Sequence, residues 1–143
     1  MIVPDANLLL YAYDSESLFH PAAARWWTGL LSEAEPVGLC PVVLFAFLRL
    51  STQPKVFDQP LTVAEASKRV GSWLARPNVR LLVAGPRHVE SVCRLLGKAG
   101  TAGNLVTDAQ IAAFALEYGA MVHTADTDFA RFTEVDWKNP LLG

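Results

Sequence analysis

Cysteine is scarce in this chain: Cys40 and Cys93 are the only two among 143 residues. Both have apolar neighbours, and neither has a second Cys or a His at zinc-site spacing, so we expect two small core residues rather than a disulfide or metal pair. The richest apolar run, residues 37–48, contains Gly38 and Pro41 and is shorter than the about 20 residues of a membrane span. No basic region precedes the first apolar residues, as it would in a secretion signal, so a cytoplasmic location without membrane contact is expected.

Charged residues make up only 18% of the chain against 52% hydrophobic residues, a composition that excludes disorder and favours one compact domain over residues 1–143. The net charge of −2 hides an asymmetry. Residues 49–98 hold nine of the twelve bases and three acids, whereas the remainder holds three bases and eleven acids. A basic middle segment can lie against nucleic-acid phosphates, although bases scattered over solvated helix faces are the commoner explanation.

Short apolar segments alternate with helical patterns along the chain. Strands are predicted at residues 1–4, 37–40, 80–84 and 120–123, and helices at residues 8–13, 20–31, 42–50, 63–75, 86–96 and 105–118. Such alternation indicates an α/β fold, in which helices cover both faces of a parallel sheet.

Local signals mark several of the element ends. Thr62 and Glu65 have the spacing of a capping box at a helix start. Three glycines predict a loop over residues 97–103, and Asn104 is suited to cap the helix that follows. Of the adjacent Trp26 and Trp27, one is expected in the core and the other against a partner chain.

Acidic residues follow two of the predicted strands. Asp5 ends the first, and Asp126 and Asp128 follow the fourth. The carboxyl ends of parallel strands meet at one edge of a sheet, which is where sites of α/β proteins lie. Asp108 lies early in a helix on the face that carries Ile111, Ala112 and Ala115, so packing of that face draws Asp108 toward the same edge.

Each of these acids also has a purely structural explanation. Asp5 can help to turn the chain, with Asn7 as the helix cap. Asp108 is favourable near a helix N-terminus, and Asp126 or Asp128 can cap a turn. The expected meeting of these acids at one edge favours a functional site over the structural explanations. Carboxylates held together without bases repel one another and raise one another's pKa, which a structural role does not require.

A divalent cation relieves that repulsion. Oxygen ligands of this kind suit Mg²⁺, with Mn²⁺ as a substitute, and such a metal activates water and stabilises a phosphodiester during cleavage. The residues alone therefore indicate a metal-dependent phosphodiesterase or nuclease. His123 adjoins the acids, but a packed strand residue is the commoner role for a histidine so placed, and a metal generates its own hydroxide.

Six motifs in order carry a family resemblance, weak singly and strong together. They are Val3 to Asn7, His20 to Trp27, Phe47 to Thr52, Thr107 to Ala112, Thr124 to Phe132, and Asn139 to Leu141. With these motifs the chain resembles, over nearly its whole length, a PIN domain of the VapC type, the toxin of a bacterial toxin-antitoxin pair.

The resemblance implies a three-layer PIN-like fold with a central parallel sheet of four to five strands. It also implies a Mg²⁺-dependent endoribonuclease that cleaves structured RNA such as tRNA or rRNA, a homodimer, and inhibition by a VapB-type antitoxin. In this family Asp5, Asp108 and Asp126 would be metal ligands and Asp128 a further catalytic acid. Asn7 and Thr124 would orient those carboxylates.

One position departs from the family pattern. The family has a Glu three residues before the Arg of the Phe-Leu-Arg segment, and this sequence has Ala46 there. Either a deliberate Glu→Ala substitution or natural loss accounts for it. In both cases we expect weaker metal binding and low ribonuclease activity.

Two other functions stay open on the sequence. A catalytically inactive PIN-fold module that sequesters antitoxin or RNA would also have Ala46. An aspartyl-phosphate phosphohydrolase also begins with a strand and an Asp-x-Asp motif, but here Asn7 takes the second position and no Lys lies near the C-terminal acids to balance a phosphate.

Overall fold

A five-stranded parallel sheet forms the centre of the computed structural model, which describes residues 1–142. The strand order is β3-β2-β1-β4-β5, and all neighbouring pairs are parallel. The strands are β1 (Ile2–Pro4), β2 (Val37–Leu39), β3 (Val79–Leu81), β4 (Met121–His123) and β5 (Trp137–Lys138). The predicted α/β class is confirmed, and the fifth strand lies beyond the four that the apolar pattern marked.

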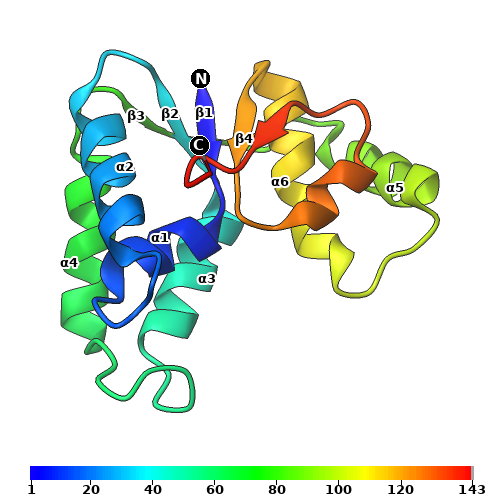
Figure 1. Cartoon of the computed structure of the whole chain (residues 1–143). Coiled ribbons are helices and arrows are strands. Elements are labelled where there is room, and N and C mark those ends of the chain that lie inside the picture. The colour runs from blue at the N-terminus through cyan, green and yellow to red at the C-terminus, as the bar shows by residue number, and fades with distance from the viewer. Residues whose placement is uncertain (143) are drawn as a thin grey trace.

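Helices flank the sheet on both sides (Figure 1). They are α1 (Ala6–Tyr13), α2 (His20–Ser32), α3 (Pro41–Ser51), α4 (Val63–Leu74), α5 (His88–Ala99), α6 (Leu105–Tyr118) and a short 3₁₀ helix, η1 (Thr127–Arg131). In Figure 1, α2 and α4 lie to one side of the strands and α5 and α6 to the other. Helix α3 packs against α1, α4 and α6, so it joins the two sides below the strands.

The topology places a switch point between β1 and β4. The chain moves outward from β1 to β2 and β3, and then returns to pair β4 with the opposite edge of β1. Ligands of open α/β sheets bind beyond the carboxyl ends of strands at such a point. The two strands that meet here are those followed by Asp5 and Asp126.

Three of the local predictions were wrong. Helix α5 continues through residues 97–99 and ends at Gly100, whose φ is +78°; an exposed Gly97 costs a helix only about 1 kcal/mol, and Ala99 packs against the core. Asn104 makes no side-chain capping bond. Cys40 is buried, but Cys93 is exposed, because it lies on the outer face of α5.

The capping box of α4 is confirmed: the Thr62 side chain accepts from the Glu65 backbone, and the Glu65 side chain accepts from the Thr62 backbone. The hydrophobic core joins both helical layers, with Val3, Leu9, Phe47 and Ile111 fully buried. None of the helices in residues 1–142 is long and apolar enough to cross a membrane.

Candidate metal and active site

Strand pairing brings Asp5 next to the start of the C-terminal acidic segment. In the register of β1 and β4, Pro4 lies beside His123, and the Asp5 backbone N–H donates to the His123 carbonyl at 2.9 Å. Asp5 and Thr124 therefore leave the sheet side by side. The parallel ladder fixes this juxtaposition, although 119 positions separate the two residues in sequence.

Asp5 is buried, with 7% of its surface exposed, and both of its carboxylate oxygens are hydrogen-bonded. One oxygen accepts from the Ala6 backbone N–H at 2.7 Å, and the other accepts from the Thr124 hydroxyl at 2.7 Å. Burial raises the pKa of Asp5, the two hydrogen bonds lower it, and the charge of Asp126 raises it further, so the net direction is upward. Asp5 is thus the N-cap of α1, and Asn7 lies inside the helix.

Thr124 connects three acidic and polar groups through one fully buried hydroxyl. This hydroxyl donates to Asp5 and accepts from the Asp126 backbone N–H at 2.9 Å. Asn7 completes the connection: its amide nitrogen lies 3.4 Å from the Thr124 hydroxyl, and its amide oxygen accepts from the Ala125 N–H at 3.4 Å. The end of β4 is therefore fastened to the start of α1 by side chains.

Asp108 reaches the same edge from α6. The helix face that it shares is buried as predicted, with Ile111 and Ala112 at 0% exposure and Ala115 at 1%. Oxygen atoms of Asp108, Asp126 and Asp128 all lie within 4.8 Å of one another, close enough to hold one metal ion. We call these three residues the acid cluster; the buried Asp5 lies beside it.

The acid cluster has little positive charge to balance it. The pKa of Asp108 is raised to about 7 by burial, by the charges of Asp5 and Asp126, by a hydrogen bond with Asp126, and by the charge of Asp128. No Lys or Arg is among these causes. Arg131 lies 3.9 Å from Asp128, but both side chains are more than half exposed, and an exposed pair of this kind contributes little. A cation at this point would relieve the repulsion.

Ala46 lies on the wall of a hollow between α3 and α6. The hollow, of about 420 Å³, is lined by Pro41, Val42, Phe45, Ala46, Arg49, Thr107 and Gln110; we call it the α3–α6 hollow. Thr107 directly precedes Asp108 on α6. The departure from the family pattern thus faces a hollow whose other wall comes from the helix that carries Asp108.

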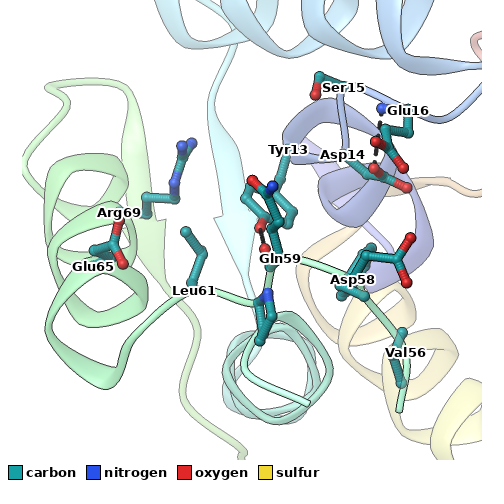
Figure 2. A pocket seen from close by; sticks show the side chains of 12 residues that line it. Tyr13, Asp14, Ser15, Glu16, Val56, Asp58, Gln59, Leu61, Glu65 and Arg69 are labelled. Carbon is teal, nitrogen blue, oxygen red and sulfur yellow. Dashed lines mark hydrogen bonds between the residues drawn. The ribbon is translucent and has the colours of Figure 1, made fainter. Parts of the chain in front are cut away.

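A larger cavity, of about 780 Å³, lies elsewhere, between the loop after α1, the loop after α3 and the face of α4. Figure 2 shows Glu65 and Arg69 entering it from α4, Asp14 and Glu16 from the loop after α1, and Asp58 from the loop after α3. These acids point from separate segments. In the part of the chain that the structure describes, they form no group with metal-binding spacing, so the chemistry is assigned to the acid cluster.

Trp26 and His123 form a contact that the sequence did not indicate. The Trp26 indole donates to His123 Nδ1 at 3.0 Å, and the imidazole is buried. Burial and the charge of Lys138 lower the pKa of His123 to about 4, so the ring is neutral at pH 7. Trp27 is in the core as expected for one of the pair, whereas Trp26 is partly covered by His123 of its own chain.

Known proteins share this architecture and sequence. The PIN domain family model matches residues 2–135. Ribonuclease VapC33 of Mycobacterium tuberculosis is 47% identical over 141 residues, with 99% of each chain covered. Ribonuclease VapC37 of the same organism is 42% identical over 140 residues, covering 98% of this chain and 97% of the relative.

Solved structures agree at the level of the fold. VapC20 of Mycobacterium tuberculosis, described as a Sarcin-Ricin loop cleaving toxin, has a TM-score of 0.70 at 19% identity, with 95% of this chain and 99% of that chain covered. VapBC2 from Rickettsia felis, bound to a DNA fragment from its promoter, has a TM-score of 0.69 at 18% identity, with 97% and 98% covered. The chain therefore belongs to the PIN-domain family, among the ribonucleases of the VapC type.

Proposed function

We propose that this chain is the toxin of a VapBC toxin-antitoxin pair and a metal-dependent endoribonuclease. The observation that carries the proposal is the acid cluster at the switch point, where three carboxylates and the neighbouring Asp5 meet with only the exposed Arg131 paired to one of them. The relatives named ribonucleases match nearly the whole length of the chain, which supports RNA as the substrate.

The donor set fits Mg²⁺, because all the groups are hard carboxylate oxygens. Asp108, Asp126 and Asp128 would hold the ion, and their 4.8 Å grouping supports Asp128 as a direct ligand. Asp5 would contribute through its charge or a further contact. When bound, the metal supplies an activated water and stabilises negative charge on the phosphodiester.

The surrounding residues orient these carboxylates. Thr124 fixes the Asp5 carboxylate and the backbone of Asp126 with one hydroxyl, and Asn7 supports both ends of that link. The Asp126 side chain in turn accepts from the Asp128 backbone at 2.9 Å. Such outer contacts set the direction of metal ligands and contribute about 10- to 100-fold to affinity or activity.

A VapB-type antitoxin and a second copy of the chain are the partners we propose. Solved structures with this fold include VapBC complexes from Rickettsia felis and from nontypeable Haemophilus influenzae. The neighbour described as a Sarcin-Ricin loop cleaving toxin supports structured RNA as the substrate class. Ala46 is expected to leave the chain with weak activity.

Incubation with total RNA tests the proposal. The Ala46→Glu form should cut RNA at defined sites in Mg²⁺ and not in EDTA, and sequencing of the cut ends identifies the target. A binding module that sequesters antitoxin or RNA is the second candidate, favoured by Ala46; its signature is tight binding without cleavage even after Ala46→Glu. The PIN-family match leaves the aspartyl-phosphate alternative without support.

Thr124→Val should weaken both the fold and the metal site. The change leaves a buried Asp5 oxygen and the Asp126 N–H without their partner, which costs about 1–3 kcal/mol and lowers the melting temperature by about 2–4 °C per kcal/mol. Mg²⁺ affinity, measured by calorimetry, should fall by about 10-fold or more. Thr124→Ser keeps the hydroxyl and should retain the affinity; equal losses in both variants would contradict this role.

A further inference from the structure

The α3–α6 hollow has a wall composition suited to a nucleotide. Phe45 is 66% exposed, although most aromatic rings of the chain are packed. Arg49 follows it by four residues on α3, so the two side chains share one face of the helix. Gln110 and Thr107 form the opposite wall, and Gln110 has only a 3.4 Å contact with its own helix backbone, which leaves amide hydrogen-bonding capacity for another group.

Arg49 is the positively charged side chain in the lining of this hollow, and no acid of the described chain pairs with it. Among residues 1–142, its guanidinium makes no ion pair, since the ion pairs there involve the N-terminus, Arg94, Lys98 and Arg131. Arg49 is also not among the charges that act on Asp5 or Asp108. With no acid of residues 1–142 paired to it, the Arg49 guanidinium is free to bind an anion.

We propose that the α3–α6 hollow is a nucleotide subsite that holds the RNA next to the acid cluster, an inference that rests on the proposed function. Phe45 stacks on a base, Arg49 binds a backbone phosphate, and Gln110 hydrogen-bonds to a base edge or a 2′-hydroxyl. Aromatic stacking combined with an arginine contact is a common way to bind single-stranded RNA. The volume of about 420 Å³ is within the range of small-molecule sites.

Charge complementarity favours RNA over a second copy of the chain as the occupant. The acid cluster repels phosphates, so a polyanion needs a positive contact close to the point of cleavage. Arg49 supplies that contact from a hollow whose α6 wall includes Thr107, the residue directly before Asp108. The carboxylates of the acid cluster would bind the metal ion, and none of them forms an ion pair with Arg49.

Binding of unfractionated tRNA in Mg²⁺ tests the subsite, with gels to verify that the RNA stays intact during titration of the chain as it stands. Arg49→Gln should weaken binding by about tenfold at low salt and reduce the slope of log K against log salt by about one unit. Phe45→Ala should weaken binding by about tenfold and leave the salt slope unchanged. Arg49→Lys should preserve the slope.

Arg87→Gln is the matched control, because Arg87 lies beside Glu117 at the far end of α6 and should leave affinity and slope unchanged. Melting temperatures of all variants verify folding. Unchanged affinity and slope in Arg49→Gln would overturn the inference. So would a Phe45→Ala variant that turns a dimer into a monomer by light scattering with unaltered RNA affinity, because that result assigns the face to a second copy.

The two proposals fail in different ways. If Ala46→Glu cleaves RNA while Arg49→Gln binds it normally, the proposed function stands and only the subsite is overturned. If the chain binds no RNA and Ala46→Glu cleaves none, both are overturned.

Discussion

Ala46→Glu should raise Mg²⁺-dependent RNA cleavage by roughly 10- to 100-fold, the range in which metal-site groups act. Ala46 is partly buried on α3 and faces the α3–α6 hollow, so a longer side chain has space to extend between α3 and α6, the helix that carries Asp108. Glu is a good helix former and should not disturb α3. Initial rates with a cleaved RNA, over a series of Mg²⁺ concentrations, measure the gain.

Ala46→Gln separates charge from size in this experiment. It has nearly the shape of Glu but no carboxylate, so its activity should stay as low as that of the unaltered chain. The added negative charge should also make metal-free Ala46→Glu less stable and enlarge its stabilisation by Mg²⁺, which thermal melts with and without EDTA detect. Equal cleavage by the Ala, Gln and Glu forms would show that position 46 does not limit activity.

Asp108→Asn should stabilise the metal-free protein and abolish its response to Mg²⁺. The Asp108 carboxylate is half-buried among other acids, which raises its pKa to about 7. Because the side chain is partly solvated, we discount that shift to an effect of about 1–2 kcal/mol, or an increase of about 3 °C or more in melting temperature in EDTA. Saturating Mg²⁺ stabilises a binding-competent form by about 2.7 kcal/mol at a hundred times Kd, and this gain should disappear.

The pH dependence of stability should change with the same substitution. Between pH 4 and 7 the folded chain keeps a proton on Asp108 that the unfolded chain, with its ordinary value of 3.8, releases. The contribution of Asp108 to the free energy of unfolding is therefore full at low pH and is lost as pH rises toward about 7. In EDTA, the difference in stability between Asp108→Asn and the unaltered chain should grow from pH 5 to pH 7.5.

Asp58→Asn provides the control for this comparison. Asp58 is an exposed acid of the cavity in Figure 2, so removing its charge should change neither the free energy of unfolding by more than about 0.5 kcal/mol nor the Mg²⁺ response. A stabilising effect at Asp58 as large as that at Asp108 would mean that net charge, rather than local repulsion, governs both results.

Sequence patterns predicted the elements that depend on local chemistry. The strand before Asp5, the capping box of Thr62 and the buried face beside Asp108 follow from short-range periodicity and capping. The predicted end of α5 was wrong because packing of Ala99 against the core outweighed the glycine signal. The meeting of the acids could be predicted because the ends of parallel strands share an edge.

Other features depend on contacts that no local pattern encodes. The Trp26–His123 bond joins residues 97 positions apart. The α3–α6 hollow exists because two helices from different crossovers come together. Ala46 is noticed only by comparison with the family pattern, because an Ala in an apolar helix is otherwise ordinary. The roles of Asp5, Asp128, Asn7 and Thr124 in catalysis stay predictions, of which the Thr124 variants test one.

The switch point also determines at what stage of synthesis the metal site of the proposed nuclease can form. Its carboxylates come from the first strand, the last long helix and the segment after β4, so the earliest and latest parts of the chain must meet before the site exists. During synthesis the N-terminal portion emerges first, and while residues beyond β4 remain in the ribosome the growing polypeptide has no complete carboxylate set. The proposed nuclease should therefore stay inactive during synthesis until the segment after β4 has emerged and folded against β1.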